Sequence, residues 1–321
     1  MIISFFEINE IEKERFKTNL KGHTLKFFED TIQNVDEKEY MDSNVISVFI
    51  HSKVNKETTN MCSNLKLIAT RSTGMDHIDI EYFMTRNVSI KNVSLYGENT
   101  VAEHTFALML SLSRKIHESY VQSTKGKFTT EGLMGFDLKG KTIGIIGGGR
   151  IGLHVARMAR SFGMHVRVYD IHQDEFLAEL INFKYVNLDE LFKTSDIISL
   201  HVPYNKHTAH MINKDSISKM KDGVVIINTA RGGLINNADL IDGLDSGKIY
   251  GAGLDVLEGE EFLFEENIFN SPIENAAKVI VESKILSEKP NVVITPHNAF
   301  NSIEAVHRII DTTIDNILSI M

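Results

Sequence analysis

Three side chains suited to acid–base chemistry or anion binding follow short apolar runs in the C-terminal half of the chain. Arg231 stands in INTARGG, Glu260 in LDVLEGEE and His297 in ITPHNAF. A guanidinium can hold a carboxylate through two parallel hydrogen bonds. An imidazole can donate and accept a proton near neutral pH, and a carboxylate bonded to one ring nitrogen would orient it. The three residues together predict proton transfer on a substrate that carries a carboxylate.

Each of these residues also has an ordinary structural interpretation. Arg231 could be a surface arginine in a glycine-rich turn, and His297 is one of 13 histidines. Glu260 belongs to an acidic run that could simply be solvated, and Glu258 and Glu261 compete with it as partners for a histidine. The prediction therefore depends on the elements that would bring these residues together.

A glycine-rich stretch upstream, TIGIIGGGRIG, has the spacing of a dinucleotide-binding loop. Gly147 allows a tight turn after an apolar strand, and Gly149 lets the backbone approach a pyrophosphate. Gly152 lets the following helix, expected over about 150–162, pack close to that strand. The N–H groups at the start of this helix would then face the phosphates. A cluster of turn glycines without a ligand is the alternative.

Asp170 ends the next apolar run, which is the expected place for a ribose-binding carboxylate. Such a carboxylate accepts hydrogen bonds from the ribose hydroxyls and repels a 2′-phosphate. The sequence therefore predicts NAD rather than NADP as the cofactor, and a hydride as the group transferred.

Short Ile- and Val-rich runs alternate with longer amphipathic stretches from residue 140 onward. Continuous apolar strands separated by helices predict a parallel sheet covered on both faces. Ligands bind at the carboxyl ends of such strands, which is where the candidate residues lie. The expected strands are Thr142–Ile146, Val166–Tyr169, Ile197–Leu200, Val224–Asn228, Gly251–Asp255 and Val292–Thr295.

The first hundred residues repeat this pattern more loosely and lack a glycine fingerprint. We expect a second, smaller α/β domain here, without its own dinucleotide site. Its expected strands are Ile2–Phe6, Leu25–Phe28, Val45–Ile50 and Leu67–Thr70.

Two amphipathic segments are predicted to be helices that join the domains. Thr100 and Glu103 have capping-box spacing before an apolar run that continues to Ile116, and Asn301 and Glu304 repeat this spacing before the last helix. That helix could return the chain to the first domain. The expected domains are 1–98 with 300–321, which would bind the substrate, and 99–299, which would bind NAD.

Composition excludes several classes of protein. The net charge is −9, and no block of Lys or Arg suggests a nucleic-acid partner. No run approaches the roughly 18 apolar residues of a membrane helix. Cys62 is the only cysteine, which is typical of a reducing compartment, and Met1–Glu10 has the pattern of a first strand rather than a signal peptide. We expect a cytoplasmic protein that binds small molecules.

Seven segments in sequence order resemble the D-isomer-specific 2-hydroxyacid dehydrogenases, and in particular the D-lactate dehydrogenases within that family. They span most of the chain, and together they are more specific than any single motif. The segments are RSTGMDHID (71–79), VAEHTFAL (101–108), IGIIGGGRIG (143–152), SDIISLHVPYNKHTAHMI (195–212), MKDGVVIINTARGG (220–233), SGKIYGAGLDVLEGEE (246–261) and NVVITPHNAF (291–300).

The resemblance implies two Rossmann-like domains, one flavodoxin-like and one NAD-binding, that close on the substrate, and a homodimer packed partly through the helix begun by Thr100. It implies that Arg231 clamps the substrate carboxylate, that His297 is the acid/base and that Glu260 keeps His297 protonated and oriented. Pyruvate would be reduced to D-lactate. The implied NAD contacts are Gly147, Gly149, Arg150, Ile151, Gly152, Asp170, Val202, Pro203, Thr208, Thr229, Ala230 and Asp255, and the implied substrate contacts are Thr73, Gly74, Tyr96, His51 and Phe300.

His51 leaves the substrate open. D-lactate dehydrogenases often have a tyrosine after the strand that here ends at Ile50, and similar enzymes for 2-hydroxyglutarate have an arginine in this region. A protonated His51 could meet a second carboxylate, or it could be a pocket-wall histidine that contacts nothing charged. Branched or aromatic 2-oxo acids are further alternatives, and similar folds also serve as NADH-responsive corepressors.

Other histidines suggest a metal site only weakly. His207 and His210 could share one turn of a helix, and His201 lies nearby. No set of carboxylates or cysteines completes such a site, and we expect no metal.

Overall fold

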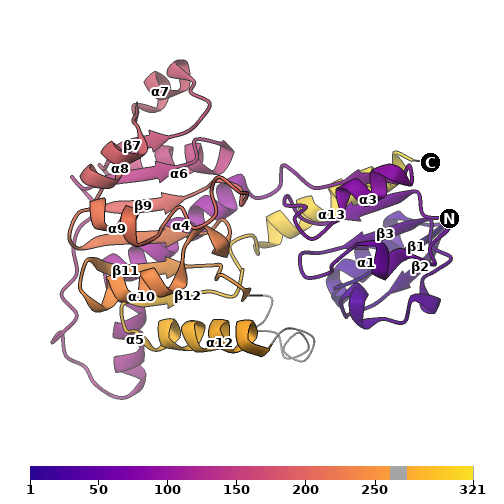
Figure 1. Ribbon diagram of the computed structural model, residues 1–321, viewed down its shortest axis with the longest axis horizontal. Coiled ribbons are helices and arrows are strands. Elements are labelled where there is room, and N and C mark those ends of the chain that lie inside the picture. The colour runs from indigo at the N-terminus through magenta and orange to yellow at the C-terminus, as the bar shows by residue number, and fades with distance from the viewer. Residues whose placement is uncertain (261–272, 321) are drawn as a thin grey trace. The chain divides into compact units, whose positions relative to one another are not determined.

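The computed structural model describes residues 1–260 and 273–320. The chain forms two compact units (Figure 1). Residues 1–96 and 301–321 make up the smaller unit, and residues 97–300 make up the larger unit. Within the described ranges, none of the helices combines the length and apolar character needed to cross a membrane.

The smaller unit is built on a five-stranded parallel sheet with the order β2-β1-β3-β4-β5. Alternate strand residues enter two separate cores: Ile46 and Ile68 join one cluster, while Val45 and Leu67 join the other. This alternation is expected when helices cover both faces of a sheet. The strands are Ile2–Phe5 (β1), Thr24–Phe27 (β2), Val45–Val48 (β3), Leu67–Thr70 (β4) and Ser89–Lys91 (β5).

Helices from both ends of the chain cover one face of this sheet. The last helix contacts the first helix and β4, and its residues Ile310, Ile314 and Ile317 are buried in the same core as Phe16. The helices of the smaller unit are Glu10–Asn19 (α1), Lys56–Thr59 (α2), Ile80–Thr85 (α3) and Ile303–Leu318 (α13), with 3-10 turns at Ile32–Asn34 (η1) and Glu37–Glu39 (η2).

The larger unit contains a seven-stranded parallel sheet with the order β12-β11-β10-β9-β6-β7-β8. The chain moves outward from β6 in one direction and then returns to place β9 on the other side, so β6 and β9 flank the point where the strand order reverses. The strands are Thr142–Ile146 (β6), His165–Tyr169 (β7), Lys184–Tyr185 (β8), Ile197–Leu200 (β9), Val224–Asn228 (β10), Ile249–Leu254 (β11) and Val292–Ile294 (β12).

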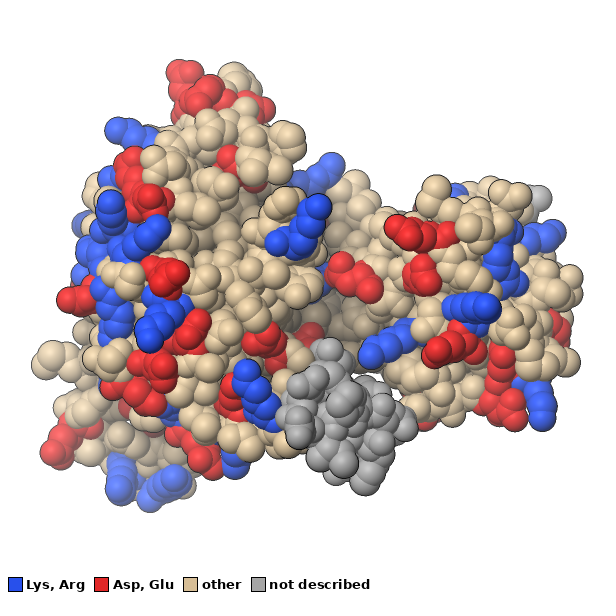
Figure 2. Space-filling model, viewed as in Figure 1, with Lys and Arg blue, Asp and Glu red and all other residues tan. Residues whose placement is uncertain are grey.

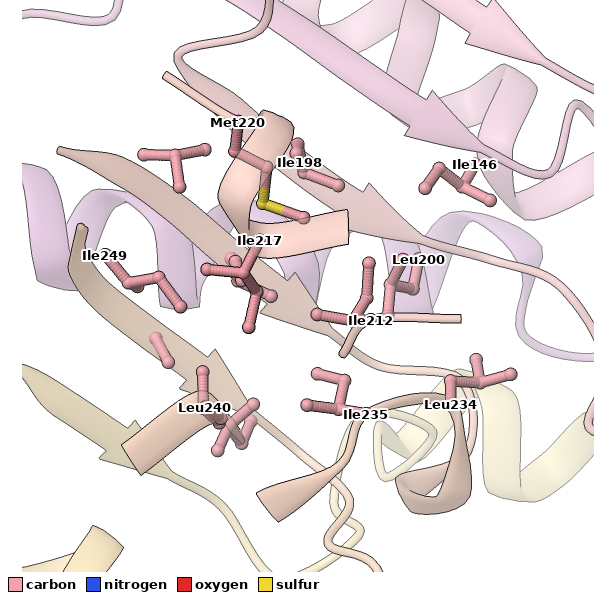
Figure 3. Packing of buried hydrophobic residues seen from close by; sticks show 14 of the residues in the cluster. Ile146, Ile198, Leu200, Ile212, Ile217, Met220, Leu234, Ile235, Leu240 and Ile249 are labelled. Carbon is pink, nitrogen blue, oxygen red and sulfur yellow. The ribbon is translucent and has the colours of Figure 1, made fainter. Parts of the chain in front are cut away.

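Two cores lie on the two faces of this sheet. Ile146, Ile198 and Ile226 point into one core, part of which Figure 3 shows, while Ile145 and Ile227 point into the other. The helices of this unit are Glu98–Ser113 (α4), Ile116–Thr124 (α5), Arg150–Ser161 (α6), Glu175–Ile181 (α7), Leu188–Thr194 (α8), Lys214–Lys219 (α9), Asn237–Asp245 (α10) and Ile273–Glu288 (α12), with a 3-10 turn at Gly232–Leu234 (η3).

The two parallel sheets confirm the predicted fold class, but both predicted helix caps are wrong. The N-cap of α4 is Gly97, so Thr100 lies inside the first turn and is buried there. The apolar run to Ile116 is also two helices, because Lys115 adopts a left-handed conformation (φ 51°) between α4 and α5. At α13 the cap is Ser302, whose side chain accepts a hydrogen bond from the N–H of Ala305; Asn301 lies one residue before it.

Three elements had no sequence signal strong enough to predict them. β5 and β8 have three and two residues, too short for a period-2 pattern to stand out. The 16-residue α12 lies in a partly acidic stretch whose apolar residues do not form a clear helical pattern.

Charged residues of both signs are interspersed on the face that Figure 2 draws. Several charged residues of the described ranges form ion pairs, as Lys221 does with Asp196 and Lys248 with Asp222. Such a surface, with a net charge of −9, does not resemble the basic stripe of a nucleic-acid-binding domain.

Candidate active site

The glycine loop after β6 has the geometry that a pyrophosphate needs. Gly147 has φ +105°, and a Cβ there would lie 2.5 Å from the carbonyl oxygen of His201. A Cβ on Gly152 would lie 1.9 Å from the carbonyl oxygen of Gly147. Gly149 is the N-cap of α6 and provides no side-chain cap, and the space at its Cβ position is open to 4 Å. The helix N-terminus is therefore accessible to an anion.

Asp170 is held at the end of β7 by two backbone donors. One carboxylate oxygen accepts the N–H of Gly148 at 2.6 Å, and the other accepts the N–H of His172 at 2.8 Å. The carboxylate thus stands beside the glycine loop, where a ribose next to the pyrophosphate would lie. These residues fit an adenine dinucleotide.

The other expected cofactor residues follow the ends of neighbouring strands in the same sheet. Thr208 bonds the carbonyl oxygen of Pro203 at 2.7 Å in the loop after β9, and the Thr229 hydroxyl lies 3.0 Å from that of Thr105 on α4. Arg150 is exposed and pairs with Glu98. The remaining members of the set are Ile151 in the first turn of α6, Val202 after β9, Ala230 after β10 and Asp255 after β11.

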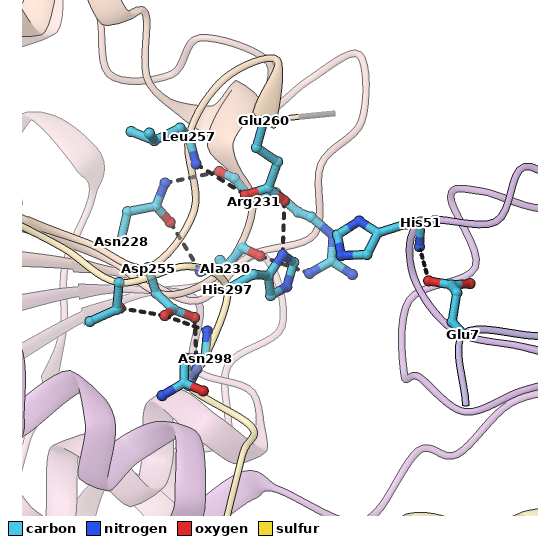
Figure 4. A network of polar contacts seen from close by, with 12 residues as sticks. Glu7, His51, Asn228, Ala230, Arg231, Asp255, Leu257, Glu260, His297 and Asn298 are labelled. Atoms are coloured by element: carbon cyan, nitrogen blue, oxygen red, sulfur yellow. Dashed lines mark hydrogen bonds and ion pairs between the residues drawn. The ribbon is translucent and has the colours of Figure 1, made fainter. Parts of the chain in front are cut away.

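His297 and Glu260 form a hydrogen-bonded pair, shown in Figure 4. Glu260 Oε1 lies 2.8 Å from His297 Nδ1, and both side chains are about three-quarters buried. Glu260 Oε2 also accepts the N–H of Leu257 at 3.3 Å, which orients the carboxylate. Because Nδ1 is bonded to Glu260, Nε2 is the ring nitrogen through which His297 would exchange a proton.

The neighbouring glutamate has a different histidine partner. Glu258 Oε1 bonds His210 Nε2, and its other oxygen lies 3.4 Å from the N–H of Asn237. Glu261 lies outside the described residues. Of the two glutamates that the structure describes in this run, Glu260 is therefore the one that contacts His297.

Arg231 lies in a turn that a buried asparagine organises. Asn228, the last residue of β10, accepts the N–H of Ala230 at 3.0 Å and donates to the carbonyl oxygen of Arg231 at 2.9 Å (Figure 4). The backbone of the next residue, Gly232, packs so tightly that a Cβ there would lie 2.0 Å from the carbonyl carbon of Leu257. The Arg231 turn and the Glu260 loop are thus in direct contact. Asn228 is a residue that we did not predict, although a polar side chain ending the run VVIIN was a usable signal.

Asp255 holds the backbone around His297. Its carboxylate accepts the N–H groups of Asn298 and Ala299 at 2.8 and 2.9 Å, and its carbonyl oxygen accepts the N–H of His297 at 2.8 Å. His297 itself has a left-handed backbone (φ 50°), which is uncommon for a non-glycine residue and requires such support.

Asp255 is ionised in spite of its burial. Burial raises the pKa of this carboxyl, but hydrogen bonds from His104 and Thr295 and from the two backbone N–H groups outweigh this and lower it overall. His104, on α4, lies 3.4 Å from Asp255 Oδ1 and 2.9 Å from the Thr295 hydroxyl. Sequence reasoning missed this contact, because nothing in a helical histidine indicates a partner so distant in the chain.

Comparison with known proteins decides the family. The family description "D-isomer specific 2-hydroxyacid dehydrogenase, NAD binding domain" matches residues 106–299. The chain belongs to this family. It is 38% identical to the aromatic 2-oxoacid reductase of Clostridium sporogenes, over 96% of this chain and 92% of that protein, and 39% identical to the hydroxypyruvate reductase of Thermotoga maritima, over 88% and 87%.

A solved structure gives the same result for the fold and cofactor. The D-lactate dehydrogenase of Aquifex aeolicus, complexed with NAD and lactic acid, superposes with a TM-score of 0.89 at 37% identity. The match covers 99% of this chain and 95% of that one. NAD is thus the cofactor of this D-2-hydroxyacid dehydrogenase, as the glycine loop and Asp170 predicted.

The expected substrate contacts of the dehydrogenase lie mostly in the smaller unit. Thr73 donates to the carbonyl oxygen of Val93 at 2.9 Å, and the carbonyl oxygen of Gly74 accepts the Ser72 hydroxyl at 2.7 Å. The carbonyl oxygen of Tyr96 accepts Arg308 Nε at 2.6 Å. His51 follows β3 in this unit, whereas Phe300 follows the His297 segment in the larger unit.

The remaining histidines do not form a metal site within the described ranges, where no group of three or more His, Cys, Asp or Glu could hold an ion. His210 has a left-handed backbone (φ 47°), so it does not share a helical turn with His207. Burial lowers the pKa of His201 to about 3, and its Nε2 bonds the Ser199 hydroxyl at 2.8 Å. His201 is therefore neutral at physiological pH.

Proposed function

We propose that the protein is a cytoplasmic reductase that converts pyruvate to D-lactate with NADH. The observation that carries the proposal is the His297–Glu260 pair beside the Arg231 turn, at the same sheet edge as the glycine loop. D-Lactate dehydrogenases are among its relatives, including the Aquifex aeolicus enzyme and one from Escherichia coli. The single cysteine suits the reducing cytoplasm.

In the proposed reaction each residue has one task. Arg231 holds the substrate carboxylate and polarises the adjacent carbonyl. Bound NADH supplies the hydride to the carbonyl carbon. His297 donates a proton from Nε2 to the carbonyl oxygen, so the product is the 2-hydroxy acid. Glu260 stabilises the imidazolium before this transfer, and the neutral imidazole then takes a new proton from solvent.

We assign the smaller unit to substrate binding. The backbone at Thr73 and Gly74 and the Tyr96 hydroxyl would meet the substrate carboxylate, and His51 and Phe300 would line the space for the substrate side chain. The support is the resemblance to the family of the segments that hold Thr73, Gly74 and Phe300, together with the hydrogen bonds that fix the backbone around Thr73, Gly74 and Tyr96.

The decisive assay has two parts. NADH oxidation is followed with pyruvate, and the configuration of the lactate is determined by chiral chromatography. We expect turnover and the D isomer. Absence of turnover with every 2-oxo acid tried, or an L product, would refute the proposal.

A different 2-oxo acid is the main competing assignment. Relatives of similar identity are named for aromatic 2-oxo acids and for hydroxypyruvate. His51 could also favour a second carboxylate, as in 2-oxoglutarate. Comparing kcat/KM for pyruvate, hydroxypyruvate, phenylpyruvate, 2-oxoisocaproate and 2-oxoglutarate selects among them, and we expect pyruvate to give the highest value.

We further propose a homodimer that packs through α4, α5 and the segment after α5. Large apolar side chains are exposed there: Tyr120 on α5 is 70% exposed, and Phe128 and Met134 are 88% and 89% exposed. Isolated chains rarely expose such a group in one stretch. Light scattering should give a dimer mass for the wild type and a monomer mass for Phe128→Glu, whereas Phe176→Glu on α7 serves as the control and should stay dimeric.

A further inference from the structure

A single carboxylate organises the segment that carries His51. Glu7 Oε2 accepts the N–H groups of Phe49 and Ser52, both at 3.0 Å, and Glu7 Oε1 accepts the N–H of His51 at 2.9 Å. Figure 4 shows the contact with His51. Both oxygens are used, and hydrogen bonds to an ionised acceptor are stronger than neutral ones. The turn after β3 is therefore wrapped around the Glu7 side chain.

Glu7 is itself held in an unusual conformation. It follows β1 with φ +52°, in the left-handed region that is uncommon for a non-glycine residue. The guanidinium of Arg71, which is buried, donates to the carbonyl oxygens of Phe6 and Glu7, both at 2.7 Å. The N–H of Glu7 donates to the carbonyl oxygen of Asp30 at 3.0 Å. The surrounding structure thus fixes the direction of the Glu7 side chain.

Gln33 holds the same segment from the other end. Its amide nitrogen donates to the carbonyl oxygen of His51 at 3.0 Å, and its amide oxygen accepts the N–H of Lys53 at 3.0 Å. The backbone of His51 therefore has its N–H bonded to one side chain and its carbonyl to another. The hydroxyl of Ser52, which is fully buried, also accepts the N–H of Ile32 at 3.1 Å.

We propose that Glu7 and Gln33 are specificity-determining positioning residues, which set the substrate range by fixing the backbone of His51. The inference rests on the proposed function, in which His51 lines the space for the substrate side chain. A fixed wall rejects a side chain larger than the space it encloses, whereas a wall that moves accepts it. Neither residue touches the substrate in this proposal, and both act through the segment from Phe49 to Lys53.

The first experiment measures kcat/KM for pyruvate and for phenylpyruvate in Glu7→Ala and Gln33→Ala. We expect the pyruvate-to-phenylpyruvate ratio to fall about tenfold in Glu7→Ala and less in Gln33→Ala, with kcat for pyruvate within a few-fold of wild type. Glu37→Ala is the matched control, because Glu37 also accepts a backbone N–H, that of Met61, in another loop of the same unit. Its ratio should not change.

The second experiment measures amide hydrogen exchange of the Phe49–Lys53 segment, which needs no turnover. Exchange should be faster in Glu7→Ala than in wild type and unchanged in Glu37→Ala. Unchanged exchange in Glu7→Ala would show that Glu7 does not fix the Phe49–Lys53 segment. Faster exchange with an unchanged pyruvate-to-phenylpyruvate ratio would show that fixing this segment does not set the specificity. If Glu7→Ala does not fold, Glu7→Gln, which keeps one acceptor oxygen, takes its place. A wild-type protein that reduces no 2-oxo acid would refute the proposed function. Hydrogen exchange would then still test whether Glu7 fixes the Phe49–Lys53 segment.

Discussion

Two histidine–glutamate pairs lie in neighbouring loops of the larger unit. They differ in which ring nitrogen of the histidine forms the hydrogen bond with the carboxylate. Glu260 bonds Nδ1 of His297, whereas Glu258 bonds Nε2 of His210. The two glutamates are separated only by Gly259, which has a positive φ of 72°. This conformation turns the chain sharply between them.

The choice of nitrogen decides what each pair can do. In the proposed mechanism, Nε2 of His297 remains to exchange a proton with the substrate, and Glu260 stabilises the imidazolium. In His210 the carboxylate bonds Nε2, so the imidazole links the loop that holds His210 to the loop that holds Glu258. Under the proposed mechanism, the same two residue types form a proton donor in one case and a structural link in the other.

The largest effect is expected from His297→Ala. This change removes the proposed proton donor, and general acid–base catalysis contributes a rate factor of about 10²–10⁴. We expect kcat for pyruvate reduction to fall about 10³-fold, while the Kd for NADH, measured by fluorescence titration, stays within a few-fold. Retention of more than a tenth of the activity would remove His297 from the mechanism.

The second prediction applies one substitution to both pairs. Glu260→Gln keeps a hydrogen-bonding oxygen but removes the charge, and a hydrogen bond to a charged group contributes about 1.5–3 kcal/mol. We expect kcat/KM to fall about 10- to 100-fold, with the larger loss at alkaline pH. Glu258→Gln, the control two residues away, should change kcat/KM far less. Equal losses in the two variants would show that the distinction between the pairs is wrong.

Sequence patterns predicted the sheets better than the contacts at their edges. The bounds of β6, β9 and β10 agree with prediction, because each is a continuous Ile- and Val-rich run ended by Gly, His or Thr. The parallel sheets and NAD are confirmed by comparison. The functional roles of Arg231, Glu260 and His297 are predictions, and the Glu260→Gln and His297→Ala variants test two of them.

The partners of the acidic side chains could not be predicted from spacing. Glu258 and Glu260 are chemically equivalent in the run LEGEE, and only the turn at Gly259 and the packing against Gly232 direct one to each histidine. The contact of His104 with Asp255 likewise depends on how α4 packs on β11, which is a long-range property. Local sequence patterns specify the helices and strands, whereas tertiary packing specifies which polar side chains contact one another.

A third histidine, His201, has no carboxylate partner among the residues that the structure describes, and it extends the comparison. Its pKa is lowered by burial to about 3, so the folded protein does not protonate it at pH 5, whereas the unfolded chain does, with a pKa near 6.5. Stability is therefore unaffected above about pH 6.5 and decreases as the pH falls from 6.5 toward 3. The loss at pH 5 is about 2 kcal/mol.

His201→Gln tests this linkage, because glutamine does not titrate and can still bond Ser199. Urea unfolding followed by circular dichroism at pH 7 and pH 5 should show wild type losing about 2 kcal/mol more than the variant. His207→Gln is the control, since His207 is exposed and should behave as wild type. An identical pH dependence in His201→Gln and wild type would contradict the neutral, buried state of this ring.

The smallest effect is expected from His210→Asn. The His210 and Glu258 side chains are 42% and 30% exposed, and ion pairs of this kind contribute about 0.2–1 kcal/mol. The loops have other links, because the His210 N–H donates to the carbonyl oxygen of Gly233 and its carbonyl accepts the Asn213 amide. We therefore expect the free energy of unfolding, measured by urea denaturation, to fall by about 0.2–1 kcal/mol, with kcat/KM near that of wild type, and high salt should reduce the difference in stability. A loss of kcat/KM as large as that of Glu260→Gln would instead place the His210–Glu258 pair within the proton-transfer machinery.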